Sequence, residues 1–519
     1  MHSCPMHSCH GCPAKGVNRR QFLAGLGALG LAAPGSAGLA YAAPWRVKRA
    51  LAAAQAAARQ APIKTPLKVQ PVLTYTISQR REATSWRPWG GLLTEQDAAQ
   101  EKERIGRELA GMARAGDFPL EVLPLAVAQT LEQAAAIAKG GHDAVITYAA
   151  GGAVPVLEAL TAPGHWNLMF VRHRSGPVYL WYEVVHPRLL RKTVDEFSHP
   201  AMDTHDIVVD DHAEILWRLR GLYGLKNALG KRVVAVGGPG GWGAGGKQAP
   251  DRARQVWKFD IRTVTYPELG ERIKRARQNS ALVKRGHAAA EKYLKQKGVA
   301  LETSKHFVLN AFVLTEVFRD LLDEAGTDAI TINQCMGTIM PMSETTACLP
   351  LSILNDEGYM AFCESDFVVI PAGVLLHYIS GRPVFFHNPT YPHDGQITLA
   401  HCTAPRKMDG KTLEPVRILT HFESDYGASP KVEMRKGQRI TSLIPDFSVK
   451  KWTGLQAEIV DNPFLHICRT QIDVAIKGNA ERLMEEMRGF HWMSAYGDYL
   501  RESGYAIRKL GVDWHNLSA

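Results

Sequence analysis

The last third of the chain carries acidic and imidazole side chains of the types that bind a divalent metal ion. Glu344 opens a predicted helix, and Glu364 and Asp366 lie two residues apart before an apolar run. His401 lies near the end of a predicted strand, and His491 follows a predicted helix. Two carboxylates and two neutral imidazoles suit an ion such as Mn²⁺ and leave positions for the hydroxyl oxygens of a substrate. Taken singly, each residue also fits a capping carboxylate or a hydrogen-bonded core histidine.

Secondary-structure signals place these residues among short strands. One helix is predicted over residues 345–355. Apolar and alternating runs predict strands at residues 367–370, 383–387, 397–402, 416–422, 438–444 and 455–460. Many short strands in succession favour a mainly antiparallel, barrel-like domain with flanking helices over residues 336–519.

The preceding residues alternate strand and helix signals, as parallel α/β domains do. The first series has predicted strands at 69–77, 120–125 and 144–149 and predicted helices at 95–115 and 128–139. A second series begins near residue 202 and includes predicted strands at 232–236 and 329–333. We therefore expect the α/β fold class, with two consecutive Rossmann-like parallel domains at residues 66–200 and 201–335, followed by the barrel-like domain.

A glycine-rich loop follows the strand predicted at 232–236. Gly241 and Lys247 have the spacing of a phosphate-binding loop, but Gln248 replaces the metal-binding Ser or Thr and Pro250 interrupts the expected helix. The loop therefore does not predict nucleotide binding. It suits a close approach of the backbone to a ligand or to a neighbouring domain.

The first 42 residues have the pattern of a twin-arginine export signal. Arg19 and Arg20 precede an apolar, Gly/Ala-rich stretch, and Ala40-Tyr41-Ala42 fits a signal-peptidase site. Residues 43–65 indicate a linker. We expect the twin-arginine translocation machinery to export the protein to the periplasm, with membrane attachment only if the signal stays uncleaved.

The eight cysteines fall into two groups. Cys4, Cys9 and Cys12 precede the arginine pair, and we expect an unstructured lead-in there, with copper or zinc binding by these cysteines and the nearby His and Met residues as the alternative. The other five lack Cys-x-x-Cys spacing, so we expect mostly buried thiols and few disulfides. These are Cys335, Cys348, Cys363, Cys402 and Cys468.

Composition excludes several classes of protein. Apolar residues make up 45% and charged residues 22% of the 519 residues, as in soluble globular chains. Lys and Arg outnumber Asp and Glu by 61 to 51, but no block of about five like charges occurs. We therefore expect a multidomain protein without a nucleic-acid partner.

The C-terminal motifs resemble those of the L-fucose and L-arabinose isomerase superfamily in order and spacing. Over residues 66–330, the two α/β units and Trp86-Arg87-Pro88-Trp89-Gly90-Gly91 are consistent with that resemblance. The motifs that carry it are Cys348-Leu349-Pro350-Leu351-Ser352-Ile353-Leu354-Asn355-Asp356-Glu357-Gly358, Cys363-Glu364-Ser365-Asp366, His401-Cys402, His491-Trp492 and Tyr496-Gly497-Asp498.

This resemblance implies a metal-dependent aldose–ketose isomerase that acts through an enediol on a sugar or related polyol. It implies that Glu344 and Asp366 bind the metal and exchange protons with the substrate, with Glu364 as the rival of Asp366. It also implies that His401 and His491 are metal ligands and that the protein is a homo-oligomer. In such a reaction the ion polarises the carbonyl and hydroxyl groups, and a carboxylate moves a proton from C2 to C1.

Further assignments stay open at the level of sequence. Trp86, Arg87 and Trp89 are candidate sugar-binding residues, through stacking and hydrogen bonds, with plain packing as the alternative. The same scaffold also suits a binding protein that has lost turnover, since a fold does not fix a function. A metal-dependent lyase or epimerase is the third possibility, and product analysis would distinguish it.

Overall fold

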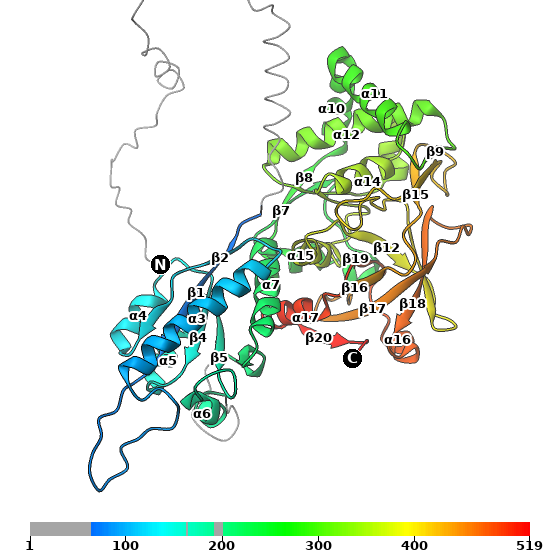
Figure 1. Ribbon diagram of the computed structural model, residues 1–519. Helices are drawn as coiled ribbons and strands as arrows, with labels where there is room; N and C mark the ends of the chain where they lie inside the picture. Colours follow the sequence, from blue (N-terminus) through cyan, green and yellow to red (C-terminus); the bar gives the residue numbers. More distant parts are fainter. Residues whose placement is uncertain (1–63, 162–163, 191–200) are drawn as a thin grey trace, which may run out of the picture. The chain divides into compact units, whose positions relative to one another are not determined.

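The computed structural model describes residues 64–161, 164–190 and 201–519 (Figure 1). The predicted signal peptide and almost all of the predicted linker lie outside these residues. Within the described ranges, no helix is both long and apolar enough to cross a membrane.

The first sheet is parallel and follows the predicted alternation of strands and helices. Its strand order is β2-β1-β4-β5-β6, and β3 also pairs with β1. Strand β4 is buried at every position, as apolar strands of parallel sheets are. The elements are β1 (Leu67–Thr74), α3 (Glu95–Ala115), β2 (Leu120–Val122), β3 (Ala126–Ala128), α4 (Leu131–Ala138), β4 (Ala144–Ala149), α5 (Val154–Leu160), β5 (Trp166–Val171), α6 (Leu180–Leu189) and β6 (Ile207–Val209).

The second sheet is also parallel, with the strand order β11-β10-β7-β8. Two parallel sheets confirm the mixed α/β class that the sequence predicts. The elements are α7 (His212–Ala228), β7 (Arg232–Val236), α8 (Gly243–Gly246), α9 (Ala249–Val256), β8 (Asp260–Val264), α10 (Tyr266–Gln278), α11 (Ser280–Leu294), α12 (Lys305–Ala325), β10 (Ala329–Ile332) and β11 (Met360–Phe362).

The sheets extend across the predicted domain boundaries. Strand β6 pairs with β5, so the first sheet continues beyond residue 200. Strand β11 pairs with β10, so the second sheet continues beyond residue 335. A separate three-stranded sheet joins β9 (Val299–Leu301) to β14 (Val416–Leu419) and β15 (Ser429–Val432). Segments that are distant in sequence therefore share sheets.

Six antiparallel strands close into a barrel in the C-terminal region, in agreement with the barrel-like prediction. Their order is β16-β19-β12-β13-β18-β17, and β17 pairs back with β16. Because β12 pairs with both β13 and β19, the end of β13 and the start of β19 flank it. The strands are β12 (Phe385–Pro389), β13 (Gln396–His401), β16 (Arg439–Pro445), β17 (Lys451–Asp461), β18 (Thr470–Lys477) and β19 (Trp492–Tyr496), with β20 (Asp513–Asn516) parallel to β17.

The strand predicted at 367–370 is wrong. These residues form a turn that leads into α15 (Ile370–Ser380), which is buried along its whole length. Pro371 lies in the first turn of this helix, where a missing amide hydrogen costs nothing. A short apolar run does not distinguish a buried strand from the start of a buried helix. The helix predicted at 345–355 corresponds to α14 (Cys348–Asp356).

Helix α7 lies against two C-terminal helices, α15 and α17 (Leu500–Arg508). A Cβ atom at Gly224 would lie 2.3 Å from Cγ1 of Ile379, and one at Gly221 would lie 2.8 Å from the carbonyl oxygen of Glu502. Glycine at these two positions therefore permits the close helix packing.

We predict that the stability of the folded protein depends on pH through the buried carboxyl of Glu414. Tyr496 donates hydrogen bonds to its two oxygens at 3.0 and 3.1 Å, and burial raises the pKa of Glu414 from 4.5 to about 7. Between these values the folded protein binds a proton that the unfolded chain releases. The free energy of unfolding should therefore fall as the pH rises from about 4.5 to about 7, and Glu414→Gln should reduce this fall.

Urea unfolding at about pH 5 and about pH 8 would test this dependence. Glu458→Gln is the control, because Glu458 is exposed on β17. We expect the control to keep the pH dependence of the natural protein. An unchanged pH dependence in Glu414→Gln would contradict the prediction.

Candidate metal centre

Three side chains of the C-terminal region converge with the geometry of a metal site. The candidate ligand atoms of Glu364, His401 and His491 all lie within 4.8 Å of one another. Oε1 of Glu364 lies 3.3 Å from Nε2 of His401, and Oε2 lies 3.3 Å from Nε2 of His491. One carboxylate thus faces two imidazoles, which is a donor set that first-row divalent ions accept.

Neighbouring groups orient the two imidazoles. Nδ1 of His491 lies 2.8 Å from Oδ2 of Asp366, and Nδ1 of His401 lies 3.2 Å from Oγ1 of Thr403. In both rings Nε2 is the atom directed to Glu364. Among the described residues, the buried Nε2 of His491 has no hydrogen-bond partner. A ring held at one nitrogen and open at the other is typical of a metal-binding histidine.

A left-handed turn after β11 separates Glu364 from Asp366. Glu364 and Ser365 have φ angles of +60° and +51°, a backbone region that L residues rarely adopt. The Ser365 amide donates to Oγ1 of Thr331 at 3.1 Å, and its hydroxyl donates to the carbonyl of Gly238 at 2.9 Å. The turn leaves the Glu364 side chain 33% exposed, whereas that of Asp366 is fully buried.

The glycine-rich loop after β7 contacts this turn through its backbone. The Gly240 amide donates to the carbonyl of Ser365, and the Phe367 amide donates to the carbonyl of Gly240, both at 3.0 Å. Trp242, from the same loop, donates from its indole nitrogen to Oε2 of Glu364 at 2.7 Å. The sequence analysis assigns no role to Trp242, although its place in this loop is a signal for one.

Charge interactions in the site favour an ionised carboxylate. Burial opposes the charge on Glu364, but His401 and His491 outweigh it and hold the pKa of Glu364 well below its usual range. Burial also opposes the charge on His491, but Asp366 and Glu364 outweigh it and raise the pKa of His491. A metal ion between these groups would take the place of the proton that the imidazole shares with the carboxylates.

Glu344 lies in other surroundings. Its Oε1 is 2.9 Å from Nη1 of Arg277 and its Oε2 is 3.3 Å from Nε2 of His306. Its side chain is 48% exposed and is not part of the convergent group. Arg277 also lines a cavity of about 390 Å³ with Gly270, Ile273, Lys274, Gln278 and Met342. The structure therefore brings His401 and His491 to Glu364, places Asp366 behind His491, and leaves Glu344 among basic residues.

The predicted sugar-binding residues lie in the loop between β1 and α3. The guanidinium of Arg87 lies 5.2 Å from the centroid of the Trp86 ring. Trp89 is 70% exposed and lines a cavity of about 190 Å³ together with Tyr75 and Gly151, at the carboxyl ends of β1 and β4. Trp89 therefore borders a cavity at the edge of the first sheet, and Trp86 and Arg87 contact each other.

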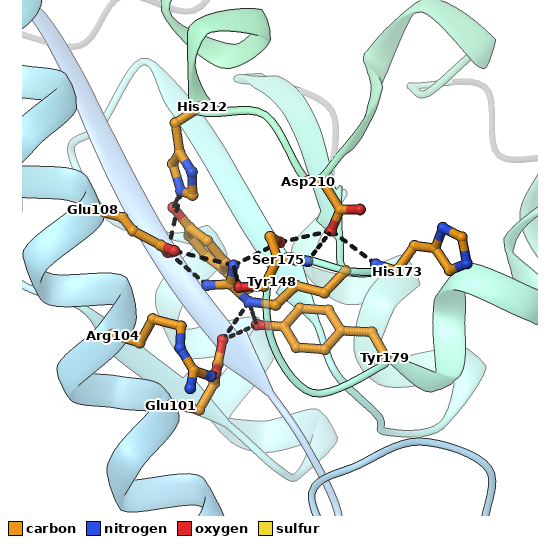
Figure 2. Close-up of polar contacts among 10 residues, drawn as sticks. Glu101, Arg104, Glu108, Tyr148, His173, Ser175, Tyr179, Asp210 and His212 are labelled. Carbon is orange, nitrogen blue, oxygen red and sulfur yellow. Dashed lines mark hydrogen bonds and ion pairs between the residues drawn. The ribbon is translucent and has the colours of Figure 1, made fainter.

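A buried ion network that the sequence does not predict lies between the first sheet and α3 (Figure 2). Arg172 is fully buried just after β5, and its Nε lies 2.6 Å from Oε1 of Glu101 on α3. Its Nη1 donates to Oε1 of Glu108 at 3.1 Å, and Tyr179 donates to Oε1 of Glu101 at 2.6 Å. Burial opposes the charge on Arg172, but these carboxylates outweigh it and raise its pKa. The arginine is matched by carboxylates, so its role is to hold α3 against the sheet.

Comparisons with known proteins gave no assignment: no protein-family model matches the chain, and no curated protein is similar to it in sequence.

Proposed function

We propose that the chain is an exported, divalent-metal-dependent isomerase that converts an aldose or a related polyol through an enediol. The observation that supports it best is the convergence of Glu364, His401 and His491, with the Nδ1 atoms of both histidines held from behind. Such a site suits Mn²⁺ and leaves positions for two substrate oxygens. The resemblance to the L-fucose and L-arabinose isomerases supplies the reaction class and suggests that both parallel sheets are Rossmann-like domains.

In this proposal Glu364, His401 and His491 hold the ion. When bound, the ion acts as a Lewis acid that acidifies the C2 proton of the sugar. Asp366 accepts from Nδ1 of His491 and keeps its Nε2 directed into the site, so it acts as a positioning residue. The proton-transfer role of Glu344 rests on the resemblance alone, because Glu344 pairs with Arg277 and His306 and is not part of the convergent group.

The remaining parts of the proposal concern substrate and setting. Trp86, Arg87 and Trp89 would bind the sugar, with Trp89 at the mouth of its cavity. The protein would act as a homo-oligomer in the periplasm, delivered by the twin-arginine machinery and without a nucleic-acid partner.

Proton exchange provides the test of the reaction class. The mature protein is loaded with Mn²⁺ and incubated with a panel of aldoses in deuterium oxide, and nuclear magnetic resonance follows the C2 proton and the formation of ketose. We expect loss of the C2 signal together with ketose for at least one sugar. His491→Ala should abolish both signals.

His393→Ala is the matched control, because the side chain of His393 is 70% exposed in a loop of the same domain. It should exchange protons like the natural protein. Binding of a sugar without exchange would favour the binding-protein alternative. Exchange that yields an epimer or a cleaved product would favour the epimerase or lyase.

A further inference from the structure

We propose that Cys348, Cys402 and His421 form a second metal centre, which binds a thiophilic d¹⁰ ion, Zn²⁺ or Cu⁺. The candidate ligand atoms of all three residues lie within 4.8 Å of one another, and all three side chains are buried. The described cysteines are free thiols, so both sulfurs are available as ligands. Two thiolates and an imidazole are the donors that zinc and cuprous ions prefer.

The sulfur separation suits a shared ion. Sγ of Cys348 lies 3.3 Å from Sγ of Cys402. Two thiolates on a tetrahedral ion at about 2.3 Å would be about 3.7 Å apart, so a small shift of the side chains would seat an ion. A disulfide would need a sulfur separation of about 2.05 Å, and it would leave the imidazole of His421 with no ion to bind.

Three separate elements build this centre. Cys348 begins α14, Cys402 follows β13, and His421 lies in the turn after β14. The hydroxyl of Ser424 lies 3.3 Å from Nδ1 of His421, so the ring is held at one nitrogen, as metal-binding histidines are. Cys468 is a candidate for a fourth ligand, because its thiol and that of Cys402 shift each other's pKa, that of Cys402 upward and that of Cys468 downward.

The second centre lies beside the first but uses different donors. Cys402 follows His401 directly, and its Sγ lies 3.9 Å from Nδ1 of that histidine. An ion at the thiols would tie the end of β13 to α14 and to the turn after β14. It would therefore fix the segment that carries His401, without contacting the substrate.

Cobalt substitution tests this centre independently of the first one. The mature protein is reduced, freed of metal with chelator and titrated with Co²⁺, because thiolates bound to Co²⁺ give an intense charge-transfer absorption and a Glu/His site does not. We expect this band in the natural protein and in His491→Ala. Cys402→Ser should weaken the band by about half or more, because one of the two thiolates is lost, and His421→Ala should weaken Co²⁺ binding about 10- to 100-fold.

Cys335→Ser is the control and should retain the band, since Cys335 lies outside the group. If Cys402→Ser does not fold, as judged by circular dichroism, Cys348→Ala and His421→Ala take its place. Displacement of Co²⁺ by Zn²⁺ or by Cu⁺, together with elemental analysis of the isolated protein, distinguishes the two ions. A band of unchanged intensity in all three ligand variants, no band in the natural protein, or a Cys348–Cys402 disulfide found by mass spectrometry would each overturn the proposal.

Discussion

Replacing Glu364 with glutamine should eliminate stoichiometric Mn²⁺ binding by a chain that lacks residues 1–42. Glu364 is the carboxylate that faces the Nε2 atoms of both histidines, and an amide oxygen lacks the charge that binds a hard divalent ion. His491→Ala should have the same effect, because it removes the buried Nε2 that faces Oε2 of Glu364. Isothermal titration calorimetry after chelator treatment measures the loss, and His393→Ala should bind Mn²⁺ normally.

The two other carboxylates, Asp366 and Glu344, should affect Mn²⁺ affinity to different extents. Asp366→Asn keeps a hydrogen-bond acceptor near Nδ1 of His491 but removes its charge, so Mn²⁺ affinity should fall about 10- to 100-fold rather than vanish. Glu344→Gln should leave Mn²⁺ affinity unchanged, because Glu344 is not part of the convergent group. If Asp366→Asn eliminated binding while Glu364→Gln did not, Asp366 would be the ligand, as the resemblance implies, and the observed geometry would not be that of the bound state.

The fold class was predictable because its signals are local. Apolar strands alternate with amphipathic helices over residues 66–335, and short strands succeed one another after residue 380. The sheet partners were not predictable in the same way. Whether β6 belongs to the first sheet, or β9 to β14, depends on pairings between segments far apart in sequence. The run at 367–370 shows the limit of local signals, since it is apolar enough for a strand but leads into a helix with a proline in its first turn.

The sequence predicts the residue types of the candidate metal site better than it predicts how they are arranged in space. His401 and His491 were accessible to sequence reasoning because each lies beside a strand end, and closure of the barrel brings these ends to either side of β12. The choice between Glu364 and Asp366 was not accessible, because it depends on two consecutive left-handed residues. Thr403 and Trp242 hold the site through contacts that no spacing pattern encodes.

Glu101 shows how an exception to a pattern can identify a buried network. It lies on the face of α3 that also buries Ala98, Ile105 and Leu109, where an apolar residue is expected. The structure explains the exception, because Arg172 and Tyr179 pair with its carboxylate (Figure 2). A charged residue at a core position of an amphipathic helix therefore predicts a buried partner of opposite charge.

Arg172→Met should destabilise the protein by about 3–5 kcal/mol, because it leaves the buried Glu101 with only Arg104 and Tyr179 as partners. Arg107→Met is the matched control. Arg107 and Glu103 lie on α3, the helix that carries Glu101, but they are 4.0 Å apart and their side chains are 72% and 76% exposed. The control should change the free energy of unfolding by about 1 kcal/mol or less. Urea unfolding, with hydrogen exchange at the amides of β4 and β5 to identify the domain that opens, measures both effects.

A double variant separates loss of an ion pair from loss of packing. If the stranded carboxylate causes the destabilisation, Glu101→Leu combined with Arg172→Met should recover much of the stability, because an apolar pair often replaces a buried ion pair at little cost. Glu108 remains half-buried and can turn to solvent. A double variant no more stable than Arg172→Met alone would mean that the arginine acts through its contacts with the rings of Phe170 and Tyr179 rather than through its ion pair with Glu101.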